Sequence, residues 1–204
     1  MAGDAALCLR EDALDYVSRA ALKLVGGLDG FELDPRGLTA MDVGSSTGGF
    51  TEVLLRRGAS HVFAVDVGRD QLHPSLRADR RVTSLESTHA KELSAELIPM
   101  PIDLVVCDVS FISICKALPA ALALTRDGAR LLTLIKPQFE LGPDAIGKNG
   151  RVLTPEPEQL AFINNEIIPF FGDLGWRSKG VIDSPILGGD GTKEFLLYAE
   201  KTPS

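Results

Sequence analysis

The sequence predicts an α/β fold built on a mostly parallel β-sheet. From residue 37 onward, short runs rich in Val, Ile and Leu alternate with stretches of helical periodicity. Gly, Asp or Pro stands at the turns between them. Several of the runs are continuously apolar rather than alternating, which is typical of parallel strands covered by helices on both faces. A Gly-rich segment joins the last two runs, which predicts a C-terminal antiparallel hairpin.

Seven segments have the length and composition of strands: 38–43, 61–67, 82–85, 102–107, 129–135, 177–182 and 195–200. Helical periodicity marks four stretches between them: 50–57, 91–97, 113–124 and 155–171. A leading helix is expected over 15–28, where apolar residues recur at helical spacing and glycines follow. The segment 142–152 is long and without periodicity, which is typical of a functional lid.

The 204 residues are enough for one globular domain of moderate size, and we expect an extension at 1–14 followed by the domain at 15–204. Cys8, Cys107 and Cys115 are an odd number without CxxC spacing, which favours reduced thiols and a cytoplasmic protein. No apolar run approaches the roughly 20 residues of a membrane span, and no targeting signal is recognisable at the N-terminus. A formal charge of -7 argues against a surface that binds nucleic acid everywhere, but it leaves room for a local basic patch.

A glycine-rich turn follows the first expected strand, with the sequence DVGSSTGGF over 42–50. It matches neither the GxGxxG fingerprint of NAD sites nor the GKS/T ending of a P-loop. Asp66, followed by Val67, closes the next strand, where a carboxylate can accept both hydroxyls of a ribose. S-adenosylmethionine fits this pattern because it has no phosphates and carries two cationic groups, one of which Asp42 would serve. Such turns also hold other ligands in α/β proteins, so the motif alone stays a hypothesis.

Two further acids are candidates for the adenine end of the cofactor. They are Glu86, after the third expected strand, and Asp103, at the beginning of the fourth. The full predicted cofactor set is Asp42, Gly44, Ser45, Ser46, Thr47, Gly48, Gly49, Phe50, Asp66, Val67, Glu86 and Asp108. His61, His73 and His89 are scattered, and no spacing predicts a metal site.

Five segments in order resemble one known family: 16–24 (YVSRAALKL), 46–51 (STGGFT), 108–113 (DVSFIS), 136–140 (KPQFE), and Ser184-Pro185 with Glu194-Phe195. Through them the chain resembles the TlyA-type hemolysin or ribosomal RNA methyltransferases, which belong with the FtsJ-like 2′-O-methyltransferases. The resemblance implies a Rossmann-like class I fold that uses S-adenosylmethionine. It implies a ribose in ribosomal RNA or ribosomal subunits as acceptor. It also places the family's catalytic Lys-Asp-Lys-Glu set on Lys23, Asp108, Lys136 and Glu194.

These four residues also suit the chemistry. A ribose hydroxyl is a weak nucleophile near neutral pH and needs a positioned base to take its proton. A lysine can serve only while it is neutral, a form that burial and a second nearby cation both favour. Lys136 would receive both effects, the second from Lys23, so we expect Lys136 to be the base. Asp108 and Glu194 would hold the two ammonium groups.

The resemblance has departures that concern the acceptor. Known members usually carry a small RNA-binding domain ahead of the segments matched here, and Ala20-Ala21, Pro74, His89 and Thr192-Lys193 replace the family's usual residues. RNA is still expected to be attracted by basic residues near the carboxyl ends of the strands. These are Arg19, Lys23, Lys136, Lys148, Arg151 and Lys193.

Other activities stay open. The alternatives are a small-molecule O-methyltransferase, a hemolysin-like membrane-active protein, and a cofactor-binding regulator without turnover. The diproline motif typical of amine methylation is missing after the fourth strand. Carbon methylation of pyrimidines generally needs a reactive cysteine, whereas Cys107 and Cys115 are expected to be buried and inert.

Overall fold

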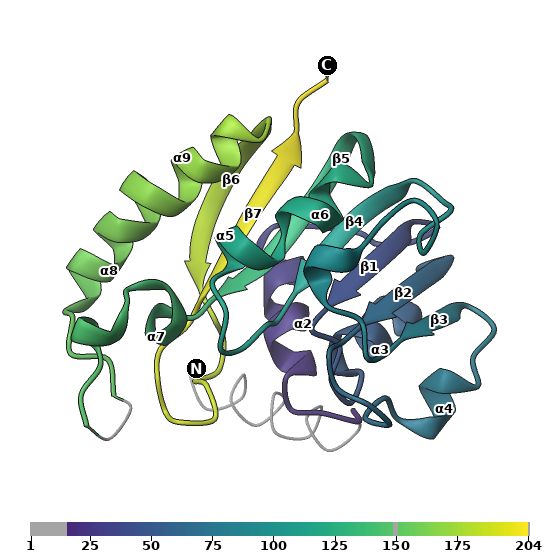
Figure 1. Ribbon diagram of the computed structural model, residues 1–204, viewed down its shortest axis with the longest axis horizontal. Helices are drawn as coiled ribbons and strands as arrows, with labels where there is room; N and C mark the ends of the chain where they lie inside the picture. The colour runs from purple at the N-terminus through teal and green to yellow at the C-terminus, as the bar shows by residue number, and fades with distance from the viewer. Residues whose placement is uncertain (1–15, 149–150, 204) are drawn as a thin grey trace, which may run out of the picture.

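The computed structural model describes residues 16–148 and 151–203, which form a seven-stranded sheet in the order β3-β2-β1-β4-β5-β7-β6 (Figure 1). The strands are β1 (Thr39–Val43), β2 (His61–Val65), β3 (Val82–Leu85), β4 (Ile102–Cys107), β5 (Thr125–Ile135), β6 (Trp176–Asp183) and β7 (Phe195–Lys201). The first five pair in parallel, and β7 runs antiparallel to both β5 and β6. The predicted α/β class and the C-terminal hairpin are both confirmed.

Helices cover both faces of the sheet. One face is covered by α2 (Ala21–Gly30), α3 (Gly49–Arg56) and α4 (Pro74–Arg77). The other face is covered by α5 (Ile114–Ala117), α6 (Pro119–Ala123), α8 (Glu156–Phe162), the π-helical η3 (Ile163–Ile167) and α9 (Ile168–Asp173). Figure 1 shows α8 and α9 lying over the end of the sheet formed by β6 and β7. This double cover explains why the strand sequences are continuously apolar.

Four further short elements complete the fold: η1 (Ala90–Glu92), α7 (Pro137–Glu140), η2 (Pro143–Ala145) and an isolated antiparallel bridge between Ile146 and Val152. The bridge and η2 give the expected lid segment local structure, with its residues 149–150 outside the described part. None of the helices in the described residues is long and apolar enough to span a membrane.

The leading helix differs from its prediction at both ends. It begins at Ala21 because backbone donors before it have other partners: Val17 N donates to Glu52 Oε2 at 2.7 Å, and Ala20 N donates to Ser18 Oγ at 3.2 Å. The helix then continues through two glycines to Gly30, since tertiary packing outweighs their low helix propensity. Asp15 and the expected extension at 1–14 lie outside the described residues.

Two other predicted helices are wrong in extent. The helix expected over 113–124 consists of α5 and α6, which are separated at Leu118 because Pro119 has no N–H to continue the ladder. The helix expected over 91–97 is only the single turn η1, after which Leu93 adopts an extended conformation. Leu93 is buried in the core from this extended segment, so tertiary packing rather than helix formation accounts for its apolar side chain.

Candidate active site

The topology brings the predicted site to one edge of the sheet. Parallel strands β1, β2, β4 and β5 end there, immediately before Gly44, Asp66, Asp108 and Lys136. Strand β7 runs the opposite way and begins at this edge, where Phe195 pairs with Ile135 of β5. The residue before β7, Glu194, therefore lies beside the end of β5.

The four residues of the predicted catalytic set form two ion pairs. Lys23 Nζ lies 2.6 Å from Glu194 Oε2, and Lys136 Nζ lies 2.5 Å from Asp108 Oδ1. All four side chains are at most 13% exposed, so little solvent screens the pairs. Lys136 Nζ also donates to Ser110 Oγ at 2.9 Å. The cluster as a whole carries no net charge when all four residues are ionised.

Burial is the main influence on the Glu194 carboxylate. It raises the pKa of Glu194, while the hydrogen bond and charge of Lys23 and then the charge of Lys136 lower it, and Asp108 raises it further. Glu194 thus feels the charges of both ion pairs, which act as one electrostatic cluster. The ammonium group of Lys23 therefore favours the ionised form of this buried carboxylate.

Gly44 holds the ends of three strands together. Its φ is +84°, and a Cβ at this position would lie only 2.7 Å from the carbonyl oxygen of Asp108. Its backbone N–H and that of Ser45 both donate to the carbonyl of Val65 at the end of β2. Only glycine combines this left-handed conformation with so close an approach to the neighbouring strand.

The Asp66 carboxylate accepts hydrogen bonds from the turn after β1 and from the turn after β2. Its Oδ2 accepts from Ser46 N at 2.8 Å, and its Oδ1 accepts from Gly68 N at 2.7 Å. A carboxylate has about four lone-pair sites, so both oxygens can still accept from a ligand hydroxyl. The position of Asp66 therefore fits the predicted contact with a ribose.

Two adjoining cavities open at this edge. The larger, of about 660 Å³, is lined by Val43, Gly44, Ser46, Val65, Asp66, Val67, Gln71, Thr88, His89, Ala90, Asp108, Val109, Ser110, Phe111, Ile112 and Ala117. The smaller, of about 160 Å³, is lined by Ser18, Ala20, Gly44, Ser45, Ser46, Thr47, Gly49, Phe50, Asp108, Ser110 and Lys136. They share four lining residues, which places their junction beside Lys136.

The lining of the larger cavity fits S-adenosylmethionine. Its walls are mostly apolar, two carboxylates face it from Asp66 and Asp108, and no lysine or arginine is among its lining residues in the described chain. A di- or triphosphate would meet these carboxylates without a compensating cation. A nucleoside that carries a cationic sulfonium is complementary to them, and the volume lies within the range of about 300–1,000 Å³ typical of ligand sites.

Most of the predicted cofactor residues line one cavity or the other, but Asp42, Gly48 and Glu86 line neither. Asp42 is fully buried behind the glycine-rich turn, where its Oδ2 accepts from Thr51 Oγ1 at 2.7 Å. Its Oδ1 has no hydrogen-bond partner among the described residues. Burial raises the pKa of Asp42 to about 7, with Asp108 adding to the effect.

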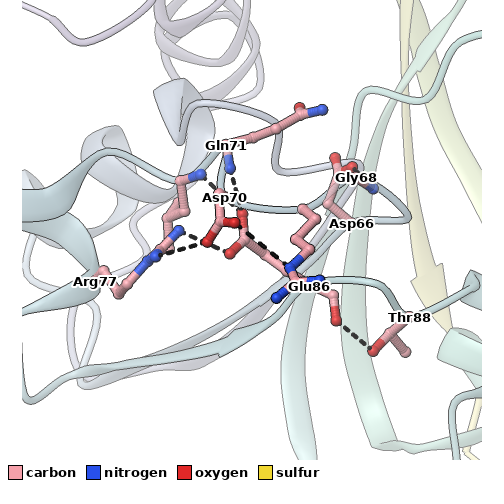
Figure 2. Close-up of polar contacts among 9 residues, drawn as sticks. Asp66, Gly68, Asp70, Gln71, Arg77, Glu86 and Thr88 are labelled. Atoms are coloured by element: carbon pink, nitrogen blue, oxygen red, sulfur yellow. Dashed lines mark hydrogen bonds and ion pairs between the residues drawn. The ribbon is translucent and has the colours of Figure 1, made fainter.

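Glu86 stabilises the wall of the larger cavity without lining it. Its Oε1 accepts from the backbone N–H groups of Gln71 and Leu72 at 2.7 and 3.0 Å, and its Oε2 pairs with Arg77 at 2.8 Å (Figure 2). The Leu72 N–H is the main cause of a lowered pKa for Glu86, opposed by desolvation and helped by Gln71 and Arg77. Glu86 is not a lining residue of either cavity, but it anchors the segment that carries Val67 and Gln71.

The expectation for Asp103 is wrong. Asp103 lies near the amino end of β4, where its Oδ2 accepts from Thr39 N at 2.8 Å and its Oδ1 pairs with Arg126 at 2.5 Å. This is the edge of the sheet opposite the cavities. An acid near the start of a parallel strand cannot reach a site at the carboxyl ends.

The geometry adds residues that the motifs did not assign. Ser110 lines both cavities, and the sequence analysis includes it in the 108–113 segment without giving it a role. Phe111 is 90% exposed, has a φ of +65°, and lies with its ring centroid 5.2 Å from that of Phe139. Side-chain exposure of this kind depends on tertiary structure and leaves no sequence pattern.

The structure confirms the predicted burial of Cys107 but not that of Cys115, which is only partly buried. Burial raises the pKa of Cys107 to about 12 and that of Cys115 to about 11, so both stay protonated thiols at neutral pH. No group of three or more His, Cys, Asp or Glu residues suited to a metal ion is found among the described residues.

Local ion pairs reduce the positive charge of the predicted basic patch. Lys193 pairs with Glu156 at 2.6 Å and with Asp183 at 2.9 Å, so its charge is locally balanced. Arg19 is exposed and donates from Nη2 to the carbonyl of Leu187 at 2.9 Å. Lys148 is exposed as well, but no described residue of the 142–152 segment lines either cavity.

Three features are typical of methyltransferases that use S-adenosylmethionine. They are a mostly parallel sheet with an antiparallel last hairpin, a cavity lined by two carboxylates, and a buried lysine beside that cavity. A sequence profile of the FtsJ-like methyltransferase family matches residues 16–201, and the chain belongs to this family.

Individual relatives agree with this assignment. The chain is 45% identical to the 16S/23S rRNA (cytidine-2′-O)-methyltransferase TlyA of Mycobacterium tuberculosis, over 90% of this chain and 68% of that protein. It is 38% identical to Hemolysin A of Brachyspira hyodysenteriae, over 91% of this chain and 77% of that protein. A solved Streptococcus thermophilus structure with a hemolysin name superposes with a TM-score of 0.87 at 42% identity, covering 93% of this chain and 68% of the other.

Proposed function

We propose that this enzyme methylates the 2′-hydroxyl of a ribose in ribosomal RNA, acting in the cytoplasm. The observation that carries the proposal is Lys136, a buried lysine held by Asp108 at the junction of the two cavities. The name of the Mycobacterium tuberculosis relative supports the same acceptor.

The residues of the chain divide the work of the reaction. S-adenosylmethionine supplies an electrophilic methyl group on its sulfonium. Asp66 would accept the hydroxyls of the cofactor ribose, and the turn from Gly44 would let the cofactor approach the backbone closely. Lys136, in its neutral form, takes the proton from the acceptor hydroxyl. Asp108 orients the amine of Lys136. Lys23 and Glu194 form a second ion pair that keeps the charges around this amine balanced.

Phe111 supports a nucleotide as the acceptor. Its ring is 90% exposed at the rim of the larger cavity and is backed by Phe139. Stacking of a base on an exposed aromatic ring contributes about 1–3 kcal/mol. A flipped or single-stranded nucleotide could stack on this ring while its ribose reaches the cavity junction.

A small-molecule O-methyltransferase is the second candidate, favoured by the formal charge of -7 and by the local pairing of Lys193. Ionic strength separates the two candidates. Binding of an RNA acceptor weakens steeply between about 50 and 200 mM salt, whereas a neutral small acceptor is nearly indifferent.

The proposal is tested by transfer of labelled methyl from S-adenosylmethionine to purified ribosomal subunits. The wild-type protein should label RNA in a salt-sensitive way, and Lys136→Ala should bind the cofactor without transferring label. Lys179→Ala is the matched control, because Lys179 pairs with Glu200 at 2.7 Å but is 40% exposed on β6. Full activity of Lys136→Ala would refute the assignment of the base. Efficient, salt-insensitive transfer to small hydroxyl compounds but not to RNA would favour the second candidate.

A further inference from the structure

Ser110 occupies a position between Lys136 and the space where an acceptor would enter. Its Oγ accepts a hydrogen bond from Lys136 Nζ at 2.9 Å. The residue is exposed and lines both cavities, whereas the Lys136 side chain is only 10% exposed. A group in either cavity can therefore approach the Ser110 hydroxyl, whereas Lys136 lines the smaller cavity alone.

We propose that Ser110 is a further catalytic residue, which relays the proton of the acceptor hydroxyl to Lys136. The proposal rests on the proposed function, since it requires methyl transfer to a hydroxyl group. It gives the acceptor proton a route to Lys136 through a side chain outside the Lys-Asp-Lys-Glu set.

Lys136 Nζ has the contacts that a relay through Ser110 requires. Asp108 Oδ1 lies 2.5 Å from the nitrogen and Ser110 Oγ lies 2.9 Å from it. In the neutral amine, one N–H can remain on Asp108 while the lone pair accepts from the Ser110 hydroxyl. A serine hydroxyl is both donor and acceptor, so its oxygen can at the same time accept from the incoming hydroxyl.

The proposed step is balanced without any further reactant. The acceptor O–H bond breaks as its oxygen bonds to the methyl carbon. The proton passes to Ser110 Oγ, and the proton of Ser110 passes to Lys136 Nζ. The bond from the methyl carbon to sulfur breaks and its electron pair stays on sulfur, which leaves S-adenosylhomocysteine, a methyl ether and an ammonium at Lys136.

Three variants test the relay in single-turnover methyl transfer to ribosomal subunits. Ser110→Ala removes the relay and should lower the rate about 100-fold, the lower end of the range for a positioned acid–base group. Ser110→Thr keeps a hydroxyl and should recover most of the rate. Ser60→Ala is the matched control, because Ser60 is exposed at the amino end of β2, where its Oγ donates only to the Leu38 carbonyl at 3.0 Å.

A proton inventory in mixtures of H₂O and D₂O distinguishes a relay from simple orientation of Lys136. Two protons in motion predict a curved dependence of the rate on deuterium fraction in the wild type and a linear one in Ser110→Ala. A rate for Ser110→Ala equal to that of Ser60→Ala, or the same inventory shape in both proteins, would overturn the relay. In that case, labelled ribose made by the wild type but not by Lys136→Ala would leave the proposed function standing.

Discussion

Removal of Lys23 provides a quantitative test of the buried charge cluster. In Lys23→Met, the Glu194 side chain stays 2% exposed but loses the ammonium that lies 2.6 Å from it. An uncompensated buried charge of this kind costs about 3–5 kcal/mol. For a domain of this size, about 2–4 °C of melting temperature per kcal/mol gives a decrease of about 6–20 °C.

The pKa of Glu194 determines how the stability loss in Lys23→Met changes with pH. Burial already raises the pKa of Glu194 in the wild type, and loss of Lys23 removes the main influence that lowers it. A carboxyl group with a raised folded-state pKa binds a proton more readily in the folded state, so its ionisation destabilises the protein as the pH rises. The deficit of Lys23→Met should therefore be larger at pH 7 than at about pH 5.

Urea or thermal unfolding measures both effects. Lys23→Met/Glu194→Gln should recover part of the lost stability, because it removes the orphaned charge. Lys179→Met should cost less than about 1 kcal/mol, because its pair with Glu200 is exposed and solvent-screened. A loss in Lys23→Met no larger than in Lys179→Met, or a deficit that grows on acidification, would refute the reasoning.

Three further variants probe the cavity walls. Gly44→Ala should lower the free energy of unfolding by about 1–3 kcal/mol and abolish cofactor binding measured by calorimetry. The added Cβ would meet the Asp108 carbonyl, and the φ of +84° is unfavourable for alanine. Normal binding would contradict the close packing. Asp66→Asn should weaken calorimetric binding of S-adenosylmethionine about 10-fold or more through loss of charge-assisted hydrogen bonds, and unchanged affinity would place the cofactor ribose elsewhere. Phe111→Ala should raise the KM for ribosomal subunits about 5- to 150-fold, as loss of base stacking predicts, with Phe111→Tyr restoring it; equal KM values would argue against stacking.

Patterns of apolar residues were sufficient to predict the parallel sheet because each buried strand presents two hydrophobic faces. They could not predict that the chain over 16–20 stays non-helical, since that depends on Glu52, a residue distant in sequence. The helix expected over 91–97 is wrong because apolar residues such as Leu93 pack into the core from an irregular segment.

The site was predictable where chemistry follows strand ends. Asp66, Asp108 and Lys136 each come directly after a parallel strand, and the family resemblance added Lys23 and Glu194. Asp103 failed because strand direction matters as much as proximity in sequence. The roles of Ser110 and Phe111 depend on which side chains remain exposed after folding, which no local motif encodes.

The most direct test of the account is to locate the transferred methyl group. Ribosomal subunits labelled by the wild-type protein would be digested to nucleosides and analysed by mass spectrometry beside a Lys136→Ala reaction. The account predicts a 2′-O-methylated nucleoside that is absent from the variant reaction. A methyl group on a base, or the same ribose methylation by Lys136→Ala, would contradict it.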